Sequence, residues 1–205
     1  LSMVWNMYDF FTLYADVDGW EWDGSLESPL SEDSNPLDAW IISRVHQLSQ
    51  EVDAHMQKYD VPNAVKPILP FIDDASNWYV RRSRKRFWKS EDDKDKQSAY
   101  NTLHYVLVQL AHILAPFTPF LAEELYMKLT EGESVHLNAW PEARQVNEIL
   151  INDMAKAREY IVQGLSLRAE AKIKVRQPLK SVTVPELPEE YVEILKDELN
   201  VKDVV

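Results

Sequence analysis

The sequence predicts a mainly α-helical protein, a helical bundle followed by a small α+β appendage. Apolar residues recur every three or four positions over residues 41–59 and again over residues 100–114, which is typical of long amphipathic helices. Near the C-terminus, residues 172–176 instead alternate strictly between charged and apolar side chains, which is typical of a strand. Short connections between the helices favour antiparallel neighbours in a bundle.

The N-terminal part is expected to be one helix and one acidic connection. A helix over residues 1–14 would place aromatic side chains such as Trp5 on one side. Residues 14–35 then contain two glycines and seven acidic residues but no Lys or Arg, which indicates a long solvated loop. Trp20 and Trp22 are expected to hold this loop against the body of the protein.

A strong helix start is predicted at Asn35-Pro36, because Asn is a favoured N-cap and Pro is favoured at the first helical position. We expect this helix to end near Tyr59 and a further helix to begin at Asp60. Prolines at positions 67 and 70 should kink the second helix.

The remaining elements are predicted from periodicity and from breaker residues. In chain order they are a turn over residues 90–96, a helix ending at Ala115-Pro116, a short helix from Pro119 to Leu129, a loop over residues 132–142 anchored by Trp140, a helix over residues 146–168, two short strands over residues 172–176 and 182–184, and a last helix over residues 189–200.

Three regions follow from this order of elements. Residues 1–35 form a first helix and an acidic connecting loop, residues 36–145 form the helical bundle, and residues 146–205 form a connecting helix and the small α+β appendage. The chain begins with Leu1 and is at once apolar and aromatic, so we expect it to be a piece of a longer protein.

Composition excludes several classes of function. The chain has no cysteine, so disulfides, thiol nucleophiles and cysteine-bound zinc are absent. Its four glycines are too far apart for a phosphate-binding loop, and its five histidines are not spaced as metal ligands. The sequence contains no apolar run of about 20 residues and no signal peptide, and we expect a cytoplasmic monomer that does not bind membranes.

The most informative feature is a basic and aromatic block at residues 77–89. It holds six cations and four aromatic residues, although the chain has a formal net charge of -12. Phosphates are bound by cations, and exposed bases stack on aromatic faces. A nucleic-acid site is therefore one interpretation, and a well-charged solvated helix face is the other.

At helical spacing the two faces of this block differ. Trp78 and Tyr79 fall on the apolar side and are expected to pack partly into the core. The candidate RNA-binding residues of the block are Arg81, Arg82, Arg84, Lys85 and Arg86, with Trp88, or less favourably Phe87, as a stacking face.

A second basic edge is predicted in the appendage. If residues 172–176 form a strand, Lys172, Lys174 and Arg176 share one face and Ile173 and Val175 the other. The alternative is a solvated strand face without a ligand.

Several segments together resemble a known family. Residues 37–44 read LDAWIISR, residues 114–124 read LAPFTPFLAEE, and residues 77–88 read NWYVRRSRKRFW. They resemble the anticodon-binding helical domain of class I aminoacyl-tRNA synthetases for branched aliphatic amino acids, and the last segment resembles the isoleucine-specific enzymes. Residues 174–179, KVRQPL, are similar to the appendage of the longer, eukaryote-like isoleucyl-tRNA synthetases.

The resemblance implies tRNA binding for an isoleucine–tRNA ligase. In that family ATP and Mg²⁺ are used by an upstream catalytic domain whose two signature motifs are absent from this sequence. The resemblance therefore implies no catalytic residue, metal ligand or cofactor in this chain, and it implies tRNA(Ile) and the rest of the parent synthetase as partners. A valyl- or leucyl-tRNA synthetase domain, or a helical scaffold that binds an acidic protein, are the alternatives.

Overall fold

A computed structural model describes residues 2–31, 34–89, 93–142 and 144–205 of the chain. The chain divides into two compact units, Leu1–Val146 and Asn147–Val205, and each is described by itself. No helix among the described residues is both long and apolar enough to cross a membrane.

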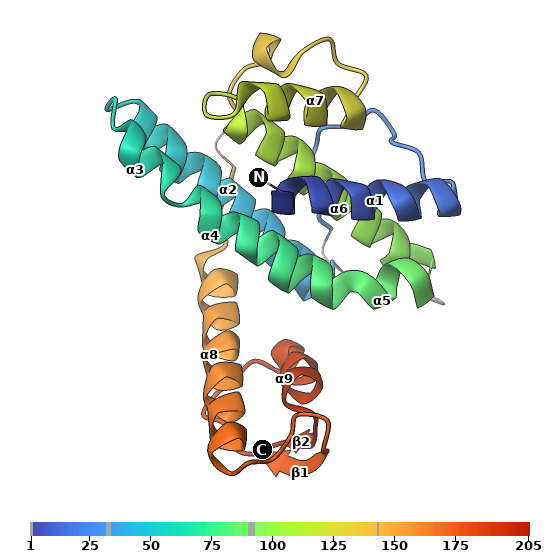
Figure 1. Ribbon diagram of the computed structural model, residues 1–205, viewed down its shortest axis with the longest axis vertical. Coiled ribbons are helices and arrows are strands. Elements are labelled where there is room, and N and C mark those ends of the chain that lie inside the picture. The colour runs from blue at the N-terminus through green and yellow to red at the C-terminus, as the bar shows by residue number, and fades with distance from the viewer. Residues whose placement is uncertain (1, 32–33, 90–92, 143) are drawn as a thin grey trace. The chain divides into compact units, whose positions relative to one another are not determined.

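All regular secondary structure in the described part of the first unit is helical (Figure 1). Its elements are α1 (Ser2–Asp18), α2 (Pro36–Met56), α3 (Val61–Val65), α4 (Ile68–Asp73), the π-helix η1 (Asp74–Val80), α5 (Arg81–Lys89), α6 (Asp93–Leu114), α7 (Pro119–Leu129) and the 3-10 helix η2 (Val135–Leu137).

Helix α2 begins where the sequence predicts. The Asn35 side chain accepts a hydrogen bond of 3.0 Å from the Leu37 amide, and Pro36 occupies the first turn, as N-cap preferences require. The helix ends at Met56 rather than near Tyr59, because Tyr59 adopts a left-handed backbone conformation with φ of 57°. Asp60 then caps α3 through the Asn63 amide.

Helix α6 runs through the core of the first unit. It begins at Asp93, so the predicted turn over residues 90–96 is wrong from residue 93 onward, and residues 90–92 lie outside the described part. Leu103, Leu107 and Leu110 are fully buried along this helix. The helix ends at Leu114 and α7 spans Pro119–Leu129, as predicted.

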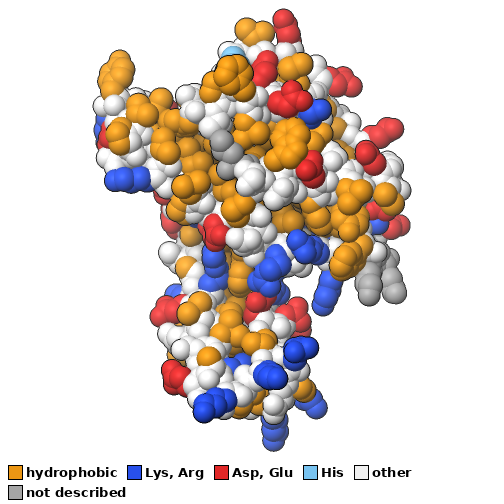
Figure 2. All heavy atoms as spheres, viewed as in Figure 1, with side chains coloured by type: hydrophobic (Ala, Val, Ile, Leu, Met, Phe, Trp, Pro, Cys, Tyr) orange, Lys and Arg blue, Asp and Glu red, His pale blue; other side chains and the backbone are white. Residues whose placement is uncertain are grey.

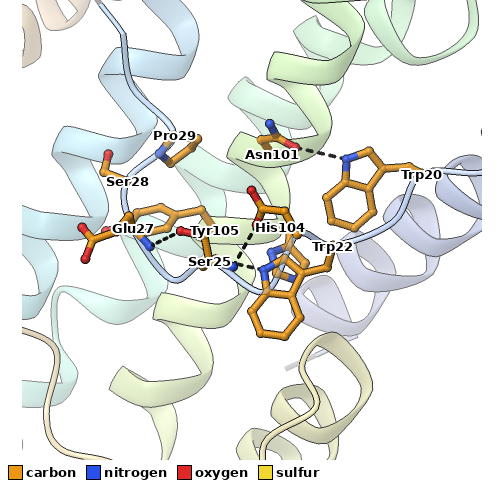
Figure 3. A pocket seen from close by; sticks show the side chains of 10 residues that line it. Trp20, Trp22, Ser25, Glu27, Ser28, Pro29, Asn101, His104 and Tyr105 are labelled. Carbon is orange, nitrogen blue, oxygen red and sulfur yellow. Dashed lines mark hydrogen bonds between the residues drawn. The ribbon is translucent and has the colours of Figure 1, made fainter.

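The acidic loop lies against α6, as predicted. The Trp20 indole donates a hydrogen bond of 3.1 Å to the Asn101 side chain, and its ring stacks on Tyr100 with centroids 6.1 Å apart. The Trp22 indole donates to the Ser25 carbonyl over 2.9 Å and its ring contacts His104. Figure 3 shows these two indoles beside a cavity of about 240 Å³ between the loop and α6.

The π-helix η1 joins α4 to α5, and the three helices follow one another without an intervening loop. A π-helix bonds each amide to the fifth residue before it, so the side chains of α5 do not continue the 3.6-residue stripe of α4. Phe71, Ala75 and Tyr79 are all fully buried, whereas in α5 the buried positions are Ser83 and Phe87.

The second unit pairs a long helix with a small βαβ arrangement. Its elements are α8 (Glu148–Glu170), β1 (Leu179–Val182), the 3-10 helix η3 (Glu189–Tyr191), α9 (Val192–Leu199) and β2 (Val201–Val204). The strands are parallel, with Leu179 opposite Val201 and Ser181 opposite Asp203. Parallel strands need a crossover connection, and η3 with α9 supplies it.

The predicted pair of strands over residues 172–176 and 182–184 is wrong. Residues 172–176 form turns and irregular backbone, with Lys172 at a φ of 57°. The buried Arg168 side chain stabilises this path, donating hydrogen bonds to the carbonyls of Lys174, Gln177, Leu199 and Asn200. Because a guanidinium carries five donors, one side chain ties the turn to the end of α9.

Candidate nucleic-acid interface

The outward side of α5 carries most of the candidate site. Arg81, Arg84 and Lys85 are exposed, and Arg82 is half-buried. Trp88 is 55% exposed, whereas Phe87 is fully buried. Trp88 is therefore the available aromatic face, and Phe87, the less favoured of the two candidates, is excluded as a stacking face.

Aromatic rings beneath the cations hold some of them in place. The guanidinium carbons of Arg81 and Arg82 lie 5.5 and 5.6 Å from the centre of the Trp78 ring, within the range of cation–π attraction. Arg84 lies 6.0 Å from the Phe10 ring of α1. Trp78 itself is 8% exposed, which confirms the prediction that it packs into the core.

Arg86 occupies a different place from its neighbours. Its guanidinium pairs with Asp38 over 2.7 Å and with Asp95 over 2.7 Å, and only 11% of its side chain is exposed. Burial lowers the pKa of Arg86, but the hydrogen bonds that it donates to Asp38 raise it, and the net shift of the pKa is upward. The prediction that Arg86 contacts RNA is not supported, because its donors are already used inside the protein.

Phe87 is buried because α1 and α6 cover it. Its ring meets Phe10 and Tyr100 edge-on, with centroids 5.1 and 4.9 Å apart. The contact of α1 with α5 was not predicted from the sequence, although the aromatic spacing of α1 is a signal that could have suggested it.

In the second unit the three predicted cations lie on exposed turns. Lys172, Lys174 and Arg176 are all exposed, but they do not share the face of a strand. Sequence reasoning missed Lys180 on β1 and Lys202 on β2, which are also exposed. Figure 2 shows Lys and Arg side chains on the surface of each unit.

Three of the five histidines lie in packed surroundings inside the first unit, whereas His55 and His136 are partly exposed beside carboxylates. Burial lowers the pKa values of His46, His104 and His112, which favours the neutral imidazole. His104 donates from Nε2 to the Leu129 carbonyl over 2.7 Å. Within the described ranges no three His, Asp or Glu side chains form a group that could hold a metal ion.

The bundle and its basic helix match a known class of domain. A family model described as the anticodon-binding domain of tRNA ligase matches residues 38–184, which run from the first turn of α2 to the end of β1 and two residues beyond it. The chain therefore belongs to this family of anticodon-binding domains, and the resemblance found in the sequence is confirmed.

The similar proteins are isoleucine–tRNA ligases. The chain is 42% identical over 215 residues to that of Clostridium tetani, 43% identical over 220 residues to that of Dehalococcoides mccartyi strain CBDB1, and 42% identical over 214 residues to that of Clostridium acetobutylicum. In each case the alignment covers 100% of this chain and 20 or 21% of the relative. The chain thus spans about a fifth of the length of these relatives.

Proposed function

We propose that the chain binds the anticodon stem-loop of tRNA(Ile) as part of an isoleucine–tRNA ligase. The observation that carries the proposal is the cluster of exposed cations on α5 beside a half-exposed Trp88, in a domain of the anticodon-binding family. An anticodon loop presents phosphates and unstacked bases, and these are the two features that cations and an indole bind.

In this proposal the contacts divide by chemistry. Arg81, Arg82, Arg84 and Lys85 bind phosphates or base edges, and Trp88 stacks on a base. The exposed Lys172, Lys174 and Arg176, together with the exposed Lys180 of β1 and Lys202 of β2, supply a second basic surface. ATP and Mg²⁺ would be bound by the rest of the parent enzyme, since the described residues offer no group for a metal and the sequence no glycine-rich loop.

The test is the affinity of the 205-residue chain for an anticodon stem-loop RNA of tRNA(Ile), measured by fluorescence anisotropy at several salt concentrations. Three or four phosphate contacts predict a log–log slope of about -2 to -4. The double variant Arg84→Ala and Lys85→Ala should bind more weakly, with a slope less steep by about 1 to 2 and an unchanged melting temperature, since exposed substitutions change stability by less than about 0.5 kcal/mol.

Lys58→Ala with Lys66→Ala is the matched control. Both lysines are exposed, and they flank α3, which Figure 1 shows far from α5 within the first unit. The control removes the same charge and should bind RNA like the parent chain. Equal losses in both double variants would mean that net charge alone governs binding, and binding of a polyglutamate peptide in place of RNA would favour a scaffold for acidic proteins.

A further inference from the structure

A buried carboxylate lies at the junction of four elements of the first unit. Asp38, in the first turn of α2, has no exposed surface. Its oxygens accept hydrogen bonds from Tyr79 Oη at 2.8 Å, from Arg86 Nη1 and Nη2 at 2.7 Å each, and from Ser98 Oγ at 2.9 Å. One side chain of α2 is thus bonded to η1, α5 and α6.

Arg86 is held from a second side as well. Its Nε donates to Asp95 Oδ2 over 3.0 Å, and Nη2 donates to the Asp95 carbonyl over 3.1 Å. The guanidinium of Arg86 therefore lies between the first turn of α2 and the first turn of α6. A bidentate pair of this kind fixes direction as well as distance, because the guanidinium fork and the carboxylate are both planar.

Helix α5 needs such a fixed direction because of the π-helix before it. The i to i+5 bonding of η1 replaces the α-helical ladder between α4 and α5, so the rotation of α5 relative to α4 depends on this less common winding being kept. Phe87 packs between Phe10 and Tyr100, but apolar packing is non-directional. Directional contacts are made instead by the Arg86 guanidinium, which bonds Asp38 of α2 and Asp95 of α6.

We infer that Asp38 is a positioning residue for RNA binding, which acts through Arg86 to set the directions of Arg84, Lys85 and Trp88. The inference rests on the proposed function of the α5 surface. Successive residues of an α-helix project about 100° apart, so fixing Arg86 toward the interior also fixes the directions of its neighbours. The carboxylate that would set these directions is that of Asp38, which lies more than 40 positions before Arg86 in the sequence.

Stability alone is a weak explanation for this arrangement. A buried ion pair is often no more stabilising than apolar residues of similar size, because both charges must be desolvated. The pair instead supplies the angular precision that several simultaneous phosphate contacts require.

The test is Arg86→Lys in the 205-residue chain, with binding to the anticodon stem-loop RNA measured at several salt concentrations. Lysine keeps the charge and one bond to Asp38 but loses the fork. We expect binding weaker by on the order of tenfold and a salt slope less steep by about 1, although the net charge is unchanged. A merely structural role would lower the melting temperature and leave the salt slope as it is, and that result would overturn the inference.

Arg44→Lys is the matched control. Like Arg86, Arg44 pairs with an aspartate, and both side chains of the pair are largely buried: Arg44 bonds Asp74 of η1 over 3.1 Å. Arg44, however, lies on α2 and not on α5. This variant should lose stability comparably and keep the parent salt slope. If both arginine variants reduce the slope equally, the effect is general loosening of the unit and the positioning role is overturned.

Ser98→Ala covers the case in which Arg86→Lys does not fold. It removes one neutral donor to Asp38, and we expect faster amide hydrogen exchange in α5 together with weaker RNA binding; unchanged RNA binding overturns the inference. Failure of the proposed function is distinguishable, because then Arg84→Ala with Lys85→Ala would bind RNA like the parent chain.

Discussion

Residues that look alike in the sequence have different roles in the structure. Trp78 and Trp88 stand in the same basic block, but Trp78 is 8% exposed and Trp88 is 55% exposed. Arg84 and Arg86 are two positions apart, yet Arg84 is exposed and Arg86 is paired with Asp38. The burial of each side chain therefore decides whether it can contact a ligand.

The two tryptophans should respond oppositely to truncation. Trp78→Ala is expected to lower the free energy of unfolding by about 3–5 kcal/mol, because it leaves a cavity in the core. Trp88→Ala is expected to leave unfolding nearly unchanged and to weaken RNA binding by about 1–3 kcal/mol, because one stacked base is lost. Urea unfolding and RNA titration measure both; a Trp78→Ala chain that unfolds like the parent but does not bind RNA would reverse the assignment of the two faces.

The buried histidines predict a loss of stability on mild acidification. An unfolded histidine has a pKa of about 6.5, and burial holds the folded-state pKa of His104 below that value. The unfolded chain then binds more protons, so the contribution of His104 is fully present above about pH 7 and is lost as the pH falls through 6.5 toward the folded pKa. His46 and His112 shift in the same direction.

Urea unfolding at pH 7.5 and at pH 5.5 checks this prediction. The free energy of unfolding should be smaller at pH 5.5, and His104→Gln should reduce the difference between the two values. A parent chain that becomes more stable on acidification over this range would contradict the prediction.

At the scale of elements, the π-helix decides which face of α5 is buried. The faces predicted for the basic block assume ordinary α-helical spacing, but the structure has η1 at Asp74–Val80. This change of winding places Ser83 and Phe87 inward and leaves Arg84 and Lys85 outward. The orientation of the candidate site thus depends on the winding of the preceding segment.

Deleting Asn77 should remove RNA binding while the chain remains helical. Asn77 is exposed and lies within η1, and its removal would restore α-helical winding and rotate α5 by about 100°. The pair of Arg86 with Asp38 would break, which we expect to cost about 3–5 kcal/mol. Circular dichroism and RNA titration check this; the matched control is Asn77→Ala, which keeps the winding and should bind RNA normally.

Elements defined by local signals were predicted well, and elements defined by distant contacts were not. Asn35 and Pro36 mark the start of α2, and Pro119 marks that of α7, because caps and prolines act on adjacent backbone. The alternation over residues 172–176 suggested a strand, but a strand needs a partner. The partner of β1 is β2, which is four residues long at Val201–Val204. Because α9 lies between the two strands in the sequence, their pairing produces no pattern among neighbouring residues.

At the scale of the whole molecule, charge is unevenly distributed. The chain has a formal net charge of -12, whereas α5 carries five of its cations among residues 81–86. Acidic surface elsewhere would repel RNA and so favour one docking pose. The acidic loop around Asp23 and Glu27, which lines the cavity in Figure 3, belongs to the repelling part.

The 205-residue chain alone should not catalyse isoleucine-dependent ATP–pyrophosphate exchange. Adenylate formation needs groups that bind the phosphates of ATP, and this sequence has neither a glycine-rich loop nor the two signature motifs of the resembled family. The incorporation of labelled pyrophosphate into ATP measures this exchange, with a full-length isoleucine–tRNA ligase as positive control. Exchange that copurifies with the chain and exceeds the blank would reveal a catalytic site in these residues.

The sequence by itself determined the helical class, the start of α2, the end of α6, both ends of α7, the family, and the block that carries the candidate site. These follow from periodicity, capping and motif, which act over a few neighbouring residues. The sequence did not determine the end of α1, which was expected at residue 14 and lies at Asp18. The tertiary structure decided the π-helical winding, the parallel pairing of β1 with β2, and the inward direction of Arg86. Each of these depends on a contact between residues far apart in the chain, such as Asp38 with Arg86, and the free energy of such a contact exists only when the folded core has brought the two side chains together.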